Sequence, residues 1–380
     1  MKFNLSRDEA SCMKGLAILC IVLHNLLHLV GPLVKENEFW YNYNFRSYWM
    51  WRHITENHPN LFGDILSFFG WYGVPVFIFL SGYGITKKYG NPQQDASWGK
   101  FIGYNFKKLW MLMLPVYLLY LLLGVTLWEK EFPWHAIIGQ LTLTNNLWVS
   151  PHFIDPGVYW YFGLTLQLYL VYRLFLHRKS TPVFWTWTVV LAIFSLALSF
   201  WLLPDERAKV QPDYEYYSHN CIRWLLPFLM GVMGARFGKG GKENRMLHLL
   251  AFFLSTSLLI ACSFHQGLWL LTPVFAVLMF ISFIKLILWI KPLKSVLCWM
   301  GGISAYLFAA HPVVRPFFTD LVVEEGQQEL DACSWLWTLA FVLIAVAVAW
   351  GYRWLSKHYL VSLCERIINS CLKWVSFKKK

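Results

Sequence analysis

Runs of about 20 apolar residues, separated by short polar loops, recur along the 380-residue chain. A helix of 20 residues is about 30 Å long, the thickness of a bilayer's hydrocarbon core. Of all residues, 57% are hydrophobic and only 14% are charged, whereas a soluble domain carries about 25% charge. The pattern predicts an all-α, polytopic membrane protein whose main partner is the lipid bilayer, and it excludes a disordered chain.

Ten apolar stretches are long enough to be transmembrane helices. They are residues 14–34, 61–85, 109–128, 158–176, 183–203, 221–237, 246–264, 267–290, 295–316 and 334–355. An eleventh stretch, within residues 132–150, holds five polar side chains that lipid does not solvate. We expect that stretch to lie outside the spans or to re-enter the membrane, within a single transmembrane domain of residues 1–357.

The distribution of charge predicts the orientation of these spans. With the N-terminus in the cytoplasm, cytoplasmic ends and loops hold 25 of the 33 Lys and Arg, and the outer side holds 16 of the 21 Asp and Glu. The positive-inside rule then places both termini in the cytoplasm of a multi-pass protein of the plasma (inner) membrane. The net charge of +12 follows from this topology, so we expect no nucleic-acid partner. The tail 358–380 is basic and amphipathic, which suits either a helix on an anionic leaflet or a solvated segment.

Polar side chains interrupt the first apolar stretch. His24 follows Lys14 by ten residues, which at 1.5 Å per residue places it about 15 Å into the membrane, close to the midplane. His28 shares its helix face, and Asn25 lies 60° behind His28. One interpretation is hydrogen bonding between helices. The other is catalysis, because lipid favours the neutral imidazole that can accept a proton.

Metal binding by the same helix is disfavoured. Cys20 lies on the face of His24 and His28, but no second Cys/His cluster in the sequence has metal-ligand spacing. The eight Cys are scattered, mostly inside apolar runs, so we expect no metal.

Several sequence blocks, in order, resemble the acyltransferase-3 family of ten-helix membrane acyltransferases. The first is Met13 to His24, and the second, residues 73–85, contains Leu-Ser81-Gly-Tyr. Lys107 and Lys108 precede a Pro, Trp160 is followed seven residues later by Gln167, and Tyr306 is followed five residues later by His311. The likeness covers residues 13 to about 316, and it implies the family's ten-helix fold.

The first block departs from the family pattern by one residue. In most of the family a basic residue is followed eleven positions later by a His, whereas here that offset from Lys14 falls on Asn25. His24 and Asn25 are therefore both candidates for the family's catalytic position. Lys14 itself replaces the usual Arg, and Thr165 replaces a Glu found in many members.

The resemblance implies an O-acyltransferase that moves an acyl group, most often acetyl, from cytoplasmic acyl-CoA to a hydroxyl of an envelope or extracellular glycan. The catalytic candidates are His24, as the base, with His28 and Asn25. The candidates for binding the CoA phosphates are basic side chains, although any cytoplasmic loop is basic: Lys14, Lys87, Lys88, Lys107 and Lys108. The candidates for contacting substrate are Ser81, Trp160, Gln167, Tyr306 and His311.

The alternative function is a transporter or flippase for a lipid-linked sugar or polysaccharide. A five-plus-five internal repeat and a mid-membrane Asp or Glu for proton coupling are typical of such proteins. We find neither in the sequence, so the acyltransferase is the preferred prediction.

Overall fold

The computed structural model describes residues 4–36, 38–39, 41, 46–94, 96–203, 212–238, 244–322 and 329–360. All regular secondary structure in these ranges is helical, which confirms the predicted all-α fold. The predicted basic tail lies almost entirely outside the described residues.

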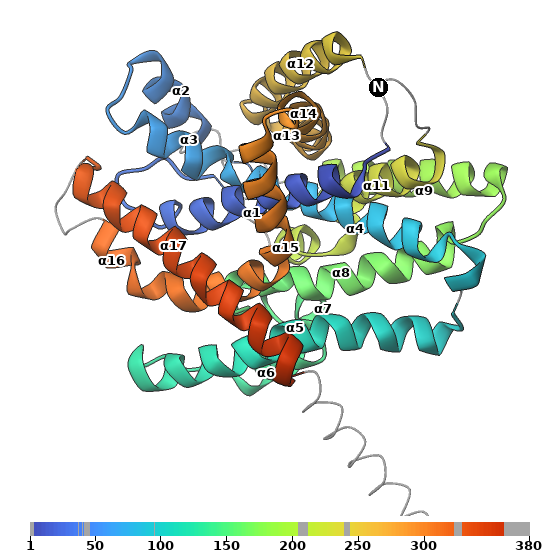
Figure 1. The fold of residues 1–380 in the computed structure, drawn as a ribbon, viewed down its shortest axis with the longest axis horizontal. Coiled ribbons are helices and arrows are strands. Elements are labelled where there is room, and N and C mark those ends of the chain that lie inside the picture. The colour runs from blue at the N-terminus through green and yellow to red at the C-terminus, as the bar shows by residue number, and fades with distance from the viewer. Residues whose placement is uncertain are drawn as a thin grey trace, which may run out of the picture.

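Long helices are packed together, and short helices lie in the segments between them (Figure 1). Their bounds are α1 Arg7–Leu27, α2 Tyr48–Thr55, α3 Leu61–Phe69, α4 Gly73–Tyr89, α5 Trp98–Leu127, α6 Trp134–Leu141, α7 Asn145–Trp148, α8 Trp160–Val171, α9 Thr181–Leu202, α10 Pro212–Ser218, α11 Leu225–Phe237, α12 Arg245–Ser263, α13 Gln266–Trp269, α14 Thr272–Ile287, α15 Lys291–Val314, α16 Thr319–Val322 and α17 Ala332–Leu355. Shorter 3₁₀ and π turns connect or extend them, including η2 Gly70–Tyr72, η5 Gly157–Tyr159, η6 Tyr172–Leu176 and η7 Cys221–Trp224.

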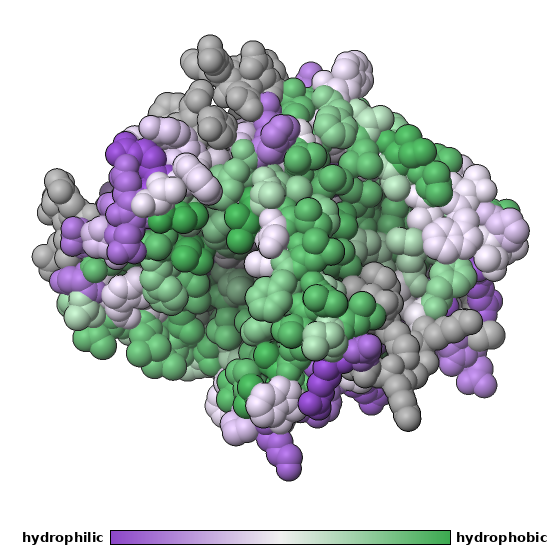
Figure 2. All heavy atoms as spheres, turned by 90° about the horizontal axis from the view of Figure 1, so that it is seen from above, coloured by the Kyte–Doolittle hydropathy of each residue, from purple (hydrophilic) through white to green (hydrophobic). Residues whose placement is uncertain are grey.

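Seven helical segments in the described ranges are long and apolar enough to cross a membrane. They are Arg7–Leu27, Leu61–Tyr89, Trp98–Leu127, Thr181–Leu202, Arg245–Ser263, Lys291–Phe317 and Ala332–Tyr359. Large apolar side chains on several of them are exposed, and Figure 2 shows a broad hydrophobic surface with hydrophilic residues toward its ends. The chain is therefore a multi-pass membrane protein whose exposed apolar surface meets lipid.

The other three predicted spans also fold as helices, but as shorter ones. Residues 158–176, 221–237 and 267–290 contain α8, α11 and α14, of 12, 13 and 16 residues, and 3₁₀ or π turns adjoin α8 and α11. A helix of 12 residues is about 18 Å long, shorter than the hydrocarbon core. The count of ten spans and the cytoplasmic location of the termini remain predictions.

The first helix begins and ends earlier than predicted. The expected range of 14–34 is wrong, because α1 runs from Arg7 to Leu27. Ser6 and Glu9 form a capping box that starts the helix within the polar N-terminal segment. Gly31 and Pro32 lie in the turns beyond its end. His24 consequently lies in the last turn of α1 rather than near its middle.

Two glycines allow α1 to pack directly against the backbone of α15. A Cβ on Gly15 would lie 2.1 Å from the Leu297 carbonyl oxygen, and one on Gly301 would lie 1.9 Å from the Ser11 carbonyl oxygen. Small residues of this kind bring membrane helices into close contact. A buried ion pair, Lys285 Nζ to Glu9 Oε1 at 2.8 Å, joins α1 to α14.

Residues 132–150 form α6 and α7, of eight and four residues. Their polar side chains are buried against protein: Gln140 Nε2 donates to Met113 Sδ at 2.7 Å, and Asn146 Nδ2 donates to the His219 carbonyl at 2.8 Å. Asn145 donates to Gln140. The polar side chains of this stretch are therefore paired with protein groups rather than exposed to lipid.

Candidate functional site

His24 is held where the end of α1 meets the junction of α3 and η2. A Cβ on Gly70 would lie 2.7 Å from the His24 Cβ, so only glycine permits this approach. The ring Nδ1 lies 2.7 Å from the Ser67 carbonyl oxygen. Because a carbonyl only accepts hydrogen bonds, Nδ1 carries the proton in this contact. In the neutral ring, Nε2 is therefore left with its lone pair available to accept a proton.

The side chain of Glu38 faces that nitrogen. Its Oε2 lies 4.0 Å from His24 Nε2, and both side chains are nearly buried, 12% and 6% exposed. Glu38 belongs to the loop that follows α1, and burial raises the pKa of its carboxyl to about 7. Sequence reasoning did not select Glu38, because a loop acid fourteen residues beyond His24 has no helical register that relates it to the ring.

Asn25 and His28 have different surroundings from His24. Asn25 lines the same small cavity as His24, but its Nδ2 donates to the Ile21 carbonyl of its own helix at 2.9 Å. The His28 ring lies 5.0 Å from the His24 ring, centroid to centroid, and its Nδ1 is buried without a hydrogen bond. Of the three predicted catalytic residues, His24 both lines the cavity and has a ring nitrogen close to a carboxyl group.

The cavity at His24, here called the His24 cavity, is small. Its volume is about 10 Å³, about the space needed for one water molecule. Besides His24, Asn25 and Glu38, its walls are mainly apolar: Ile21, Val74, Val158, Trp160, Tyr161 and Phe308.

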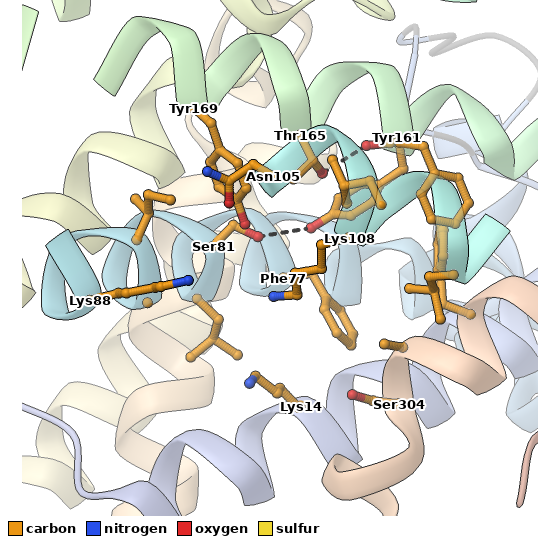
Figure 3. A pocket seen from close by; sticks show the side chains of 18 residues that line it. Lys14, Phe77, Ser81, Lys88, Asn105, Lys108, Tyr161, Thr165, Tyr169 and Ser304 are labelled. Carbon is orange, nitrogen blue, oxygen red and sulfur yellow. Dashed lines mark hydrogen bonds between the residues drawn. The ribbon is translucent and has the colours of Figure 1, made fainter. Parts of the chain in front are cut away.

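A larger cavity of about 300 Å³ lies among α1, α4, α5, α8 and α15 (Figure 3). Three ammonium groups from three helices line it, those of Lys14, Lys88 and Lys108. Described acidic residues are absent from its lining, whose other polar side chains are Ser81, Asn105, Tyr161, Thr165, Tyr169 and Ser304. This space, here called the lysine cavity, is suited to an anionic ligand with an uncharged arm.

The two cavities follow one another along the same four helices. On α1, Lys14 lines the lysine cavity, and Ile21 and His24, about 10 and 15 Å further along the helix, line the His24 cavity. In each of the segments containing α4, α8 and α15, likewise, residues toward one end line the lysine cavity and residues toward the other end line the His24 cavity. Tyr161 and Phe308 line both, so this ring pair stands between the lysines and His24.

The remaining predicted site residues are divided between these cavities and other places. Ser81 lines the lysine cavity, and Trp160 lines the His24 cavity. Lys87 faces a separate cavity of about 580 Å³ with Arg178, Lys179 and Arg236, and Lys107 is absent from the lining of all three cavities.

Three residues predicted to contact substrate instead make contacts within the protein. Gln167 donates to Asn146 Oδ1 at 2.8 Å and accepts from the Cys221 amide at 3.1 Å. The Tyr306 ring packs against Tyr352, and His311 Nδ1 donates to the Leu307 carbonyl at 3.0 Å. The structure does not bring these three side chains to either of the two aligned cavities.

One cluster in the described residues has a possible ligand set for a metal ion: His53, His58 and Asp64 offer atoms within 4.8 Å of one another. The two imidazoles are stacked with an interplanar angle of 11°, so their in-plane lone pairs do not converge on one point. Asp64 already accepts from the Val34 amide at 2.7 Å and contacts His53 Nδ1 at 2.6 Å. These contacts connect α2, α3 and the loop after α1.

Comparison with known proteins identifies the family. The acyltransferase-3 family model, described as an acyltransferase domain, matches residues 8–354. The chain therefore belongs to the acyltransferase-3 family and is an acyltransferase. Neither a curated protein sequence nor a solved structure is significantly similar to it.

Proposed function

We propose that this membrane acyltransferase moves an acetyl group from acyl-CoA to a hydroxyl of an envelope or extracellular glycan. The observation that supports this most directly is the His24 ring, whose Nδ1 is occupied by the Ser67 carbonyl while Nε2 faces a cavity and Glu38. Such a ring can act as a general base.

The lysine cavity is suited to the donor. CoA carries phosphates at one end and a thioester at the other, joined by an uncharged arm. The ammonium groups of Lys14, Lys88 and Lys108 would attract the phosphates, and the arm would extend toward Tyr161 and Phe308. The thioester then approaches His24 from one side, and the acceptor hydroxyl approaches from the side of Glu38.

The transfer needs one proton acceptor and no redox step. His24 Nε2 takes the hydroxyl proton as the oxygen attacks the thioester carbonyl. The carbon–oxygen bond forms, the carbon–sulfur bond breaks, and the proton passes to the leaving thiolate. An ionised Glu38, 4.0 Å away, stabilises the imidazolium. Arg46 and Arg315 lie within electrostatic range of His24 and offset the charge of the oxyanion.

The charge pattern supports a direction for the transfer. Lys14, Lys88 and Lys108 belong to the segments that the positive-inside rule assigns to the cytoplasm, where acyl-CoA is made. Glu38 belongs to a loop assigned to the outer side of a plasma (inner) membrane. The acceptor would then be a glycan or lipid-linked glycan outside that membrane.

The test measures CoA release from radiolabelled acetyl-CoA by the purified protein in lipid vesicles, with envelope glycans as acceptor. We expect His24→Ala to lose at least about 100-fold in rate, the usual contribution of a general base. His152→Ala removes an exposed imidazole that lines neither cavity and controls for folding. Full turnover by a folded His24→Ala protein would overturn the role of His24, and acetyl-CoA left unchanged by the native protein would show that acetyl-CoA is not the donor.

A further inference from the structure

Tyr161 and Phe308 are the only described residues that line both the lysine cavity and the His24 cavity. They come from α8 and α15, and their ring centroids lie 5.1 Å apart. A donor arm that enters among the lysines must therefore place its thioester at this ring pair to bring the acyl carbon near His24.

Neighbouring contacts hold both rings in place. The Tyr161 hydroxyl and Ser81 Oγ are 3.3 Å apart, within hydrogen-bonding distance across α8 and α4. Phe308 is 8% exposed and packs against the Phe162 ring at 5.7 Å as well as against Tyr161. Two rings fixed from different helices do not move apart without disturbing the packing between those helices.

Beyond the rings there is little space for an acyl chain. The His24 cavity holds about 10 Å³, so a methyl group can be accommodated with small shifts, whereas a longer chain requires the walls to move. Trp160, one of those walls, is 2% exposed and stacks on Trp224 at 5.5 Å. Packed interiors resist added methylene groups strongly.

We propose that Tyr161 and Phe308, with the small space behind them, select the acyl donor by length and favour the two-carbon acetyl thioester. This inference rests on the proposed function, because it assumes that acyl-CoA occupies the lysine cavity. It assigns to the ring pair a role that differs from catalysis: the rings decide which thioester reaches His24, and they take no part in proton transfer.

The experiment compares CoA release from acetyl-, butyryl- and hexanoyl-CoA by the vesicle-embedded protein with envelope glycans present. For the native chain we expect acetyl-CoA to react at least about tenfold faster than hexanoyl-CoA, because a single methylene in a closed pocket already changes rates by about tenfold or more. Phe308→Ala opens the passage, so its acetyl-to-hexanoyl ratio is expected to fall by about tenfold or more. Phe308→Leu removes less volume, so its acetyl-to-hexanoyl ratio is expected to lie between those of the native chain and of Phe308→Ala.

Leu307→Ala is the matched control. Leu307 is the preceding residue on the same helix, is fully buried, and lines neither of the two cavities. Truncation of Leu307 loosens the packing of α15 without widening the space between Tyr161 and Phe308, so the acetyl-to-hexanoyl ratio of Leu307→Ala should equal that of the native chain. If Leu307→Ala lowers the acetyl-to-hexanoyl ratio as much as Phe308→Ala does, loosened packing of α15 explains the effect and the proposed length selection is wrong.

Two outcomes separate this inference from the proposed function. If the native protein releases CoA from acetyl- and hexanoyl-CoA at equal rates, the enzyme uses acyl-CoA and the length selection is wrong. If it releases CoA from none of the three thioesters, the proposed donor is wrong and the length selection fails with it.

Discussion

At the scale of single residues, one position in the first helix separates two sequence-based hypotheses. Counting from Lys14 by the family spacing selects Asn25, whereas the imidazole is at His24. In the structure the Asn25 amide bonds to its own helix, and His24 Nε2 faces the cavity and Glu38. These contacts are the reason why His24, rather than Asn25, is the proposed base.

Glu38 predicts a pH dependence. Its pKa is raised to about 7 by burial, so the carboxyl is neutral below that pH and charged above it. Since the charged form stabilises the imidazolium of His24, the rate of acyl transfer should rise as the pH increases through about 7. Glu38→Gln should abolish this inflection and lower the rate above pH 7 by about tenfold or more. Rates measured from pH 5.5 to 8.5 check this, and an unchanged profile in Glu38→Gln would assign the inflection to another group.

Gly70 predicts a positioning effect on His24. A Cβ there would lie 2.7 Å from the His24 Cβ and 2.8 Å from the Cys20 carbonyl oxygen, so Gly70→Ala must shift α1 relative to Gly70 and displace the His24 ring. We expect kcat to fall by about tenfold or more, because misplacement of a catalytic group by 1 Å is costly, while KM for acetyl-CoA stays the same. Gly351→Ala, a helical glycine whose added Cβ would meet open space, is the control. Equal kcat values for the two variants would contradict the prediction.

At the scale of helices, contact between backbones determines where α1 lies. Gly15 and Gly301 allow α1 and α15 to touch, and the buried Glu9–Lys285 pair connects α1 to α14. Because α1 carries both Lys14 and His24, these contacts position one wall of each cavity.

Gly15→Ala tests this packing against helix propensity. Alanine is favoured over glycine within a helix by about 1 kcal/mol. The added Cβ would, however, lie 2.1 Å from a backbone oxygen that cannot move alone, and such overpacking costs about 1–3 kcal/mol. We therefore expect a lower Tm in detergent for Gly15→Ala. Gly103→Ala adds a Cβ to α5 in open space and should keep or raise Tm. If Gly103→Ala lowers Tm as much as Gly15→Ala does, contact between α1 and α15 is not the cause of the lower stability.

At the scale of the whole molecule, basic residues that the same topology rule predicts line different cavities. Lys87 and Lys88 are neighbours on α4, yet Lys88 lines the lysine cavity and Lys87 faces a different one. The positive-inside rule predicts both charges and does not distinguish their roles.

This neighbouring pair allows a matched test of donor binding. Lys88→Gln should raise KM for acetyl-CoA by roughly fivefold, as expected for the loss of about 1 kcal/mol from a partly screened phosphate contact. Added salt should reduce the difference in KM between Lys88→Gln and the native protein. Lys87→Gln should leave KM unchanged. Equal effects of the two substitutions would indicate that overall surface charge, rather than the cavity, attracts the donor.

The sequence alone determined the all-α class, the membrane environment and the family, because each depends on local or summed properties: apolar runs, charge counts and motif order along the chain. It also selected His24 and the lysines as candidates. Their grouping was decided by tertiary structure, since it depends on how α1, α4, α5, α8 and α15 pack. Glu38 reaches His24 from a loop, Gln167 and His311 bond elsewhere, and Tyr161 and Phe308 meet across residues distant in sequence. Helical periodicity describes one helix at a time, and a site shared by five helices is set by their packing.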